Sequence, residues 1–298
     1  MKHFLIFLFM ISGLFAREMQ FDQYRAFQYL EKQVAFGPRV PGTEAHRVCR
    51  DWIIDMCQQS ADTVLVQTFR AYRPVTKDTV DAYNIIARIR PEQPQRVMLS
   101  THWDTRPFAD KDIFYSNKPV PGANDGASGT AVLLEILECL PKFDSDIGID
   151  IIFWDAEDMG IAGNGMYFCQ GSEYYAYYPI SPIPQIGILI DMIGDQNLEI
   201  PIEANSMLYA PELVLEVWDI AHKLGYQNVF PKKIGQEIYD DHIPLNIIAG
   251  IPTIDLIDFH YYHQGRNIWH TVHDLPAYCS PYSLKCIGDI LLFWLSRK

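Results

Sequence analysis

The chain has 298 residues, of which 49% are hydrophobic, 20% charged and 13% aromatic. This is the composition of a globular protein, and it excludes a disordered, collagen-like or low-complexity chain. The 37 acidic side chains outnumber the 24 basic ones and leave a net charge of −13. Because an acidic surface repels phosphate groups, we expect no nucleic-acid partner and no docking on an anionic membrane.

The first sixteen residues have the pattern of an export signal. Lys2 and His3 precede the apolar run at residues 4–11, and the small residue Ala16 offers a cleavage point. This run is too short to span a bilayer as a helix. We therefore predict a signal peptide at residues 1–16, one catalytic domain at residues 17–298, and a secreted or periplasmic protein. We expect no membrane insertion after signal cleavage, and a monomer.

Hydrophobic patterning predicts helices and strands that alternate along the chain. Amphipathic helices are predicted over residues 21–34, 211–224 and 283–295. Two further helices are predicted, one from Thr43 to about residue 58 and one over 126–140, whose first turn is made of small residues. Strands are predicted over residues 64–69, 82–89, 97–100, 147–154, 186–193 and 253–257. Near-continuous apolar strands that alternate with helices favour an α/β fold. We predict a single domain with a central twisted, mostly parallel mixed sheet flanked by helices.

The six cysteines do not indicate a thiolate metal site. They lie at positions 49, 57, 139, 169, 279 and 286, and none belongs to a C-x-x-C pair. Six cysteines in a chain of this length are also too few for a disulfide scaffold. We expect most of them to be buried apolar side chains.

Acidic and histidine side chains recur where the predicted strands end. His102 follows one strand, Glu157 and Asp158 follow the next, and Asp191 lies near the end of a third. Further residues of this kind are Asp104, Asp125, Asp240, Asp241, His242 and His270. Because the carboxyl ends of the strands line the ligand crevice in open α/β sheets, these groups can converge from distant parts of the chain.

A cluster of carboxylates and imidazoles needs a cation to offset the repulsion between its members. Oxygen and nitrogen donors of this kind suit Zn²⁺, and a catalytic zinc keeps three protein ligands and one open position. Of the adjacent pair Glu157 and Asp158, one residue can bind the metal while the other serves as general acid and base. Singly, each residue has an ordinary explanation: His102 as a hydrogen-bonded core residue, Asp125 as a helix cap. Their joint occurrence favours a metal site.

Five segments together resemble the zinc aminopeptidase-like superfamily, which contains secreted zinc aminopeptidases and the animal-type glutaminyl cyclases. The segments are residues 100–105, 122–129, 155–158, 189–194 and 268–271, and the resemblance runs from about residue 36 to the C-terminus. The stretch Asp240-Asp241-His242-Ile243-Pro244 and residues 269–274 resemble the glutaminyl cyclases in particular. The resemblance implies a zinc exopeptidase-like fold.

The resemblance to the cyclases implies conversion of the N-terminal glutamine of peptides or proteins to pyroglutamate, with release of ammonia. It implies one zinc ion, held by Asp125, Asp158 and His270, and Glu157 as the general acid and base. It also implies a hydrogen-bonded pair of carboxylates that organises the site, and an aromatic wall for the glutamine side chain. The pair is Asp191 with Asp241, and the wall is Trp269.

A two-zinc aminopeptidase that hydrolyses N-terminal residues is the alternative. In that case Asp125 would bridge two ions, and His102 and Asp191 would bind the second. We expect Asp241 to distinguish the cyclase from the aminopeptidase, because a hydrogen bond between Asp241 and Asp191 would keep Asp191 from acting as a metal ligand. Two departures from the cyclases concern the substrate: the acidic pair is Glu-Asp where the cyclases often have Glu-Glu, and residues 124–126 resemble the aminopeptidases more. A metal-free binding ectodomain is disfavoured by the intact acid, base and ligand set.

Overall fold

The computed structural model describes residues 20–140, 146–161, 163 and 165–298. The predicted signal peptide lies outside the described residues. The described helices include none that is long and apolar enough to cross a membrane. All six cysteines are buried, which agrees with their expected role as apolar side chains.

Six strands form the central sheet, in the order β1-β2-β4-β3-β5-β6. They are β1 (Thr63–Arg73), β2 (Asp78–Ile89), β3 (Arg96–His102), β4 (Gly148–Trp154), β5 (Ile186–Asp191) and β6 (Thr253–Ile257). Strands β4, β3, β5 and β6 run parallel, whereas β1 and β2 form an antiparallel edge. Strands β3 and β4 are buried along their whole length, as expected for strands covered on both faces. The predicted mostly parallel mixed sheet is confirmed.

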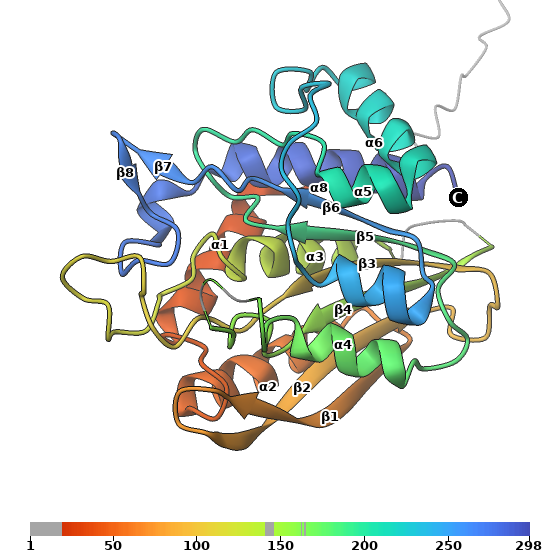
Figure 1. Cartoon of the computed structure of the whole chain (residues 1–298). Coiled ribbons are helices and arrows are strands. Elements are labelled where there is room, and N and C mark those ends of the chain that lie inside the picture. The colour runs from red at the N-terminus through yellow and green to blue at the C-terminus, as the bar shows by residue number, and fades with distance from the viewer. Residues whose placement is uncertain (1–19, 141–145, 162, 164) are drawn as a thin grey trace, which may run out of the picture.

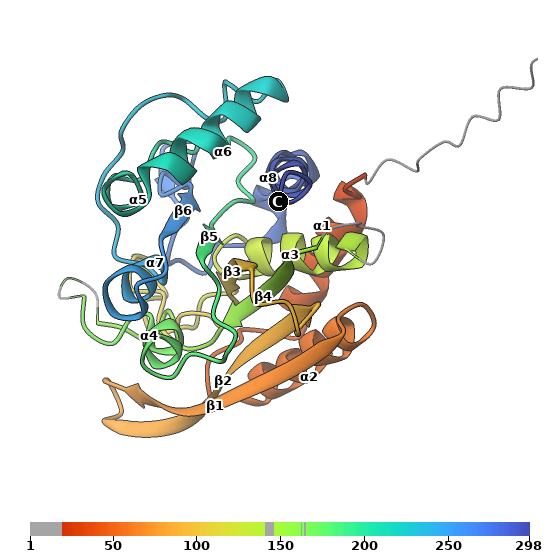
Figure 2. The same ribbon diagram turned by 90° about the vertical axis from the view of Figure 1, so that its right-hand side faces the viewer.

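Helices cover both faces of this sheet (Figures 1 and 2). The larger apolar core joins one face to α1 (Gln23–Ala35), α2 (Glu44–Gln58), α3 (Ala127–Cys139), α6 (Pro211–Lys223) and α8 (Pro281–Leu295). The opposite face packs against α4 (Gln170–Tyr177) and the turn that contains α7 (His242–Pro244). Helix α5 (Ala204–Tyr209) lies against β6 and α6. The result is a three-layer α/β domain.

Helix α3 lies close to the sheet because its first turn is made of small residues. A Cβ atom at Gly129 would lie 2.1 Å from Thr101 Oγ1, so only glycine permits this approach to β3. The helix is buried along almost all of its length between the sheet, α1 and α8. Its start, directly after Asp125, is therefore held firmly over the carboxyl end of β3.

The remaining elements form the rim of the sheet. A two-stranded hairpin of β7 (Tyr262–His263) and β8 (Arg266–Asn267) follows β6, and it leads to His270. Helix α4, which the hydrophobic pattern does not predict, begins after Cys169, a residue with left-handed backbone (φ 55°). Residues of the hairpin and of the loop before α4 line hollows at this edge of the sheet.

Candidate metal centre and active site

The structure brings most of the predicted site residues together at the carboxyl edge of the sheet. Strand β3 ends at His102, β5 ends at Asp191, and β4 leads into Glu157 and Asp158. Two further residues complete the cluster from outside the sheet: Asp125, just before α3, and His270, after β8. The cluster gathers side chains that lie up to 168 residues apart, counted from His102 to His270.

Asp125, Asp158 and His270 form a set of three metal donors. One ligand atom of each lies within 4.8 Å of the others, and all three residues are buried. His270 Nε2 lies 3.5 Å from Asp125 Oδ2 and 3.4 Å from Asp158 Oδ1. Asp158 Oδ2 is buried without a hydrogen-bond partner among the described residues, so it has a lone pair to offer. Two carboxylates and one imidazole fit the three protein ligands of a catalytic zinc.

His102, Asp125 and Asp191 form a second donor set that shares Asp125 with the first. His102 Nε2 lies 3.0 Å from Asp191 Oδ1 and 3.1 Å from Asp125 Oδ1. The residues for one ion, and those for a second ion bridged by Asp125, are therefore both in place. The positions of the donors alone do not separate the two alternatives.

The first donor set is supported by an ionic chain behind it. Asp110 Oδ1 lies 3.3 Å from His270 Nδ1, and Arg106 donates hydrogen bonds of 2.9 and 2.8 Å to Asp110. Arg106 also contacts Asp158 Oδ1 at 3.0 Å. Burial alone would raise the pKa of Asp110, but hydrogen bonds from His270 and Arg106 lower it well below its usual range. Asp110 is thus a charged partner that orients His270.

Two further aspartates hold the backbone of the metal-binding loops. Asp274 accepts hydrogen bonds from the backbone N–H groups of Asn124 and Asp125, at 2.8 and 3.1 Å. Asp104 does the same for Glu157 and its neighbour, at 3.0 and 3.3 Å. Sequence reasoning assigned neither residue a role. Both lie in segments that resemble the superfamily, residues 100–105 and 269–274, which marks them as residues near the site. Sequence spacing alone, however, does not distinguish a carboxylate that binds backbone N–H groups from one that binds a metal ion.

Glu157 lies in surroundings that suit a general acid and base. Burial raises the pKa of its carboxyl well above the usual value, and the negative charge of Asp158 adds to this effect. The Cys169 thiol donates to Glu157 Oε1 at 3.5 Å, and the Cys169 backbone N–H donates to the Glu157 carbonyl oxygen at 2.8 Å. The side chain and the backbone of Glu157 are therefore both held by one residue.

Among the described residues, Asp241 has a hydrogen-bond partner other than the predicted Asp191. The Asp241 carboxylate is fully buried and accepts a hydrogen bond from the Ser172 hydroxyl instead. Its neighbour Asp240 is the residue that lines the same pocket as Asp191 and Glu157. The chain turns into α7 at this point, so adjacent side chains point in different directions, and spacing cannot say which of them faces the pocket.

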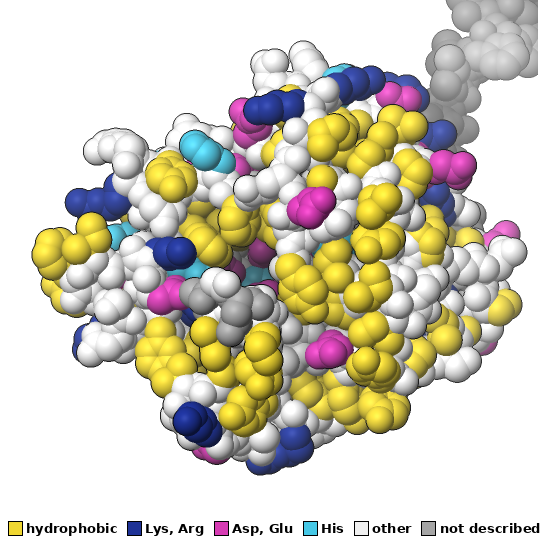
Figure 3. Space-filling view, in the orientation of Figure 1, with side chains coloured by type: hydrophobic (Ala, Val, Ile, Leu, Met, Phe, Trp, Pro, Cys, Tyr) yellow, Lys and Arg dark blue, Asp and Glu magenta, His cyan; other side chains and the backbone are white. Residues whose placement is uncertain are grey.

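A pocket of about 330 Å³ opens onto these groups. Trp269 lines it and stacks on His270, with ring centroids 3.8 Å apart, and Phe259 packs against Trp269 at 4.8 Å. Figure 3 shows the hollow, with histidine and acidic side chains at its base and hydrophobic side chains around it. Its size and mixed lining suit a small polar group with an aliphatic stem.

Fold and site together define an α/β enzyme with the architecture and donor arrangement of the zinc-dependent exopeptidases. The chain matches Peptidase family M28 over residues 84–295, which is more than half of its length. The chain belongs to this family.

Individual proteins similar to this chain include both glutaminyl cyclases and an aminopeptidase. A solved glutaminyl cyclase of Porphyromonas gingivalis is 36% identical, with a TM-score of 0.89 over 93% of this chain and 98% of that one. Glutaminyl-peptide cyclotransferase of Drosophila melanogaster is 28% identical over 80% of this chain and 70% of its own length. Aminopeptidase YwaD of Bacillus subtilis is also 28% identical, but the chain spans only 43% of its length. The predicted resemblance to glutaminyl cyclases within the zinc aminopeptidase-like superfamily is confirmed.

Proposed function

We propose that this protein is a zinc-dependent glutaminyl-peptide cyclotransferase, which converts the N-terminal glutamine of peptides and proteins to pyroglutamate and releases ammonia. The observation that carries the proposal is that Asp240, Asp191 and Glu157 line one pocket. Burial and the negative charge of Asp191 raise the pKa of Asp240 well above its usual range. A protonated Asp240 would add no further negative charge to the donor set of Asp191, and this lower charge favours one metal ion over two.

The reaction joins two groups of the same residue. The α-amine attacks the side-chain amide carbon, a carbon–nitrogen bond of a five-membered ring forms, and the original amide bond breaks to release ammonia. Because both groups belong to one glutamine, the step gains from proximity once the pocket holds the side chain folded back. No enzyme nucleophile is required.

The chain's own residues supply the proton transfers. Glu157 accepts a proton from the attacking amine and returns it to the departing nitrogen, and its raised pKa suits both transfers. Zinc, held by Asp125, Asp158 and His270, would supply a Lewis acid for the side-chain carbonyl. Trp269 provides an apolar wall for the methylene groups of the glutamine.

The two-zinc aminopeptidase is the second candidate. It is favoured by the second donor set of His102, Asp125 and Asp191, and by the similarity to the Bacillus subtilis aminopeptidase. Under that alternative Glu157 would activate a water molecule for attack on the first peptide bond.

One incubation separates the two candidates. The protein is mixed with Gln-Ala and, in parallel, with Ala-Ala, and both ammonia and free amino acids are measured, together with zinc content per chain. We expect ammonia from Gln-Ala only, with one tightly held zinc. Free alanine from both dipeptides with two zinc ions would establish the aminopeptidase instead.

We further propose that the protein is exported, with cleavage after about residue 16, and that it acts outside the cytoplasm as a monomer. The apolar segment at residues 4–11 and its basic start support export. N-terminal sequencing of the protein from the producing cell, with size-exclusion chromatography, tests both points. An intact Met1 or a stable dimer would contradict them.

A further inference from the structure

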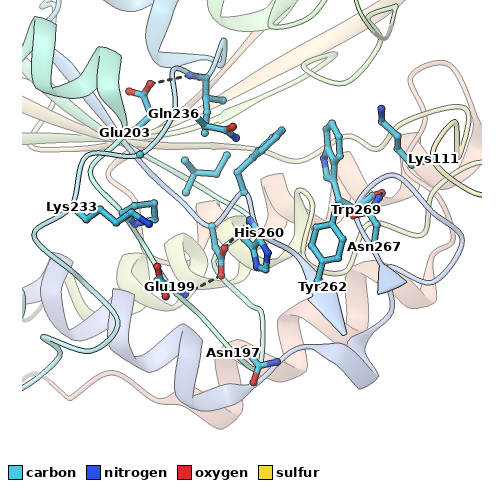
Figure 4. A pocket seen from close by; sticks show the side chains of 16 residues that line it. Lys111, Asn197, Glu199, Glu203, Lys233, Gln236, His260, Tyr262, Asn267 and Trp269 are labelled. Carbon is cyan, nitrogen blue, oxygen red and sulfur yellow. Dashed lines mark hydrogen bonds between the residues drawn. The ribbon is translucent and has the colours of Figure 1, made fainter. Parts of the chain in front are cut away.

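A second cavity of about 830 Å³ adjoins the active-site pocket and is larger than it (Figure 4). The two cavities have six lining residues in common: Lys111, Gln236, Ile238, Ile257, Phe259 and Trp269. The larger cavity, which we call the side groove, therefore begins at the wall where the proposed glutamine pocket ends. None of the donor residues of the candidate metal centre lines it.

We propose that the side groove binds the second and following residues of a peptide substrate, and that it favours an aromatic or large apolar side chain directly after the glutamine. This inference rests on the proposed function and specifies its substrate class. A peptide whose first residue fills the small pocket must leave it in an extended form, at roughly 3.3–3.6 Å per residue. The side groove is the adjoining hollow with room for several such residues.

The aromatic wall of the side groove supplies the selectivity. Trp269 and Phe259 form its part nearest the pocket, with ring centroids 4.8 Å apart, and His260 stacks on Tyr262 at 4.8 Å farther along. Tyr262 is 45% exposed, so its ring is available to a ligand rather than committed to the core. Aromatic faces of this kind favour contact with another ring or a large aliphatic group.

The opposite side of the groove is polar. Figure 4 shows Lys233 and Gln236 across from Tyr262 and Trp269. Within the described residues, the Gln236 side chain makes no hydrogen bond, so its amide is available to pair with a peptide backbone. Lys233 and Glu199 add one positive and one negative charge to the lining, so we expect little selection by charge from this pair.

The experiment compares two substrates in the native protein and in a groove variant. The substrates are Gln-Ala-Ala-Ala and Gln-Phe-Ala-Ala, which differ only in the side chain that follows the glutamine. The variant is Tyr262→Ala, and the control is Tyr282→Ala, which removes another exposed tyrosine (57%) that lines neither cavity. The kcat and KM are measured separately for each pair.

We expect the native protein to favour Gln-Phe-Ala-Ala by about tenfold in kcat/KM, mainly through KM. Tyr262→Ala should remove most of this preference while it changes kcat on Gln-Ala-Ala-Ala less than twofold, and Tyr282→Ala should leave the preference unchanged. Equal loss of kcat/KM on both substrates, or no loss on Gln-Phe-Ala-Ala, overturns the groove proposal alone. Failure of the native protein to cyclise any glutamine peptide overturns the proposed function first.

Discussion

Asp110 Oδ1 lies 3.3 Å from His270 Nδ1, whereas Nε2 of the same ring faces Asp125 and Asp158. A carboxylate in this position holds the proton on Nδ1 and leaves the lone pair of Nε2 for a metal ion. Arg106 binds both Asp110 and Asp158, so the two sides of the donor set are joined through one guanidinium. The orientation of His270 therefore depends on a residue that does not itself face the metal position.

Replacement of Asp110 by alanine should weaken zinc binding by about 10–100-fold, because the imidazole loses the partner that fixes its tautomer and orientation. The affinity is measured by competition with a chromogenic chelator. Asp110 is 25% exposed, so the fold should tolerate the change. The control is Asp219→Ala, which removes an exposed carboxylate next to Lys232. Equal affinities in Asp110→Ala and the native protein would show that His270 is oriented without Asp110.

Glu157→Gln should abolish turnover but keep the metal. The amide cannot take the proton from the attacking amine, and loss of a general base costs about 10²–10⁴-fold in rate. Ammonia release from Gln-Ala and zinc content are measured on the same preparation. The matched control is Glu173→Gln, which alters an exposed carboxylate on α4. Turnover that persists in Glu157→Gln would remove Glu157 from the mechanism under either candidate function.

Cys169 should tune Glu157 through the thiol hydrogen bond of 3.5 Å. A donor to the carboxylate favours its charged form, so Cys169→Ala should raise the pKa of Glu157 further. The acidic limb of the kcat/KM profile should then move to higher pH, because the base form is lost sooner as pH falls. Cys169→Ser keeps a donor and should restore the native profile. A profile that is the same in all three proteins would limit Cys169 to a packing role.

Sequence patterning predicts the elements that are long and apolar. Strands β4 and β5 and helix α3 are buried runs of hydrophobic residues, so their positions follow from composition alone. Helix α4 is eight residues long, rich in tyrosine and preceded by the left-handed Cys169, and no apolar period marks it. The sequence therefore predicts whether a segment is a helix or a strand where that segment is fully buried, but not for a short element such as α4 at the edge of the fold.

The same limit applies to the site. The donor residues could be found because a metal site needs acidic and imidazole groups at strand ends, where the fold must bring them together. The choice between Asp240 and Asp241 could not be made, because it depends on how the backbone turns into α7. The supporting roles of Asp104 and Asp274 could not be predicted for another reason. Both residues bind backbone N–H groups, and almost every residue type has one, so the sequence does not mark their partners.

The role proposed for Asp240, in place of the one expected for Asp241, leads to a paired prediction. Asp240→Asn should lower kcat at least tenfold, since it removes the ionisable group beside Asp191 in the pocket. Asp241→Asn should have a much smaller effect on kcat, because Asp241 lies outside the pocket, where Ser172 donates to it. Steady-state kinetics on Gln-Ala and thermal melting of both variants test this. A larger loss of kcat in Asp241→Asn would reinstate the pairing expected from the sequence.

Glu203 should contribute stability that depends on pH. Its carboxylate caps α5 by accepting from the backbone N–H groups of Asn205 and Ser206, and it lies 3.2 Å from His242 Nε2. Burial alone would raise the pKa of Glu203, but the hydrogen bond with His242 and those from the backbone lower it from 4.5 to about 2. Such a shift stabilises the folded state by a few kcal/mol, on the order of 3, when the carboxyl is ionised.

The sign of this effect follows from which state takes up the proton first. Above pH 4.5 the carboxylate is ionised in both states and its contribution is complete, whereas between pH 4.5 and about 2 the unfolded chain is protonated first and the contribution is lost. Glu203→Gln should therefore lower the free energy of unfolding near pH 7, and its difference from the native protein should shrink as pH falls through that window. Urea unfolding at several pH values measures this, with exposed Glu212→Gln as the control. A difference that stays constant down to pH 3 would mean that the capping hydrogen bonds, rather than the charge, carry the contribution of Glu203.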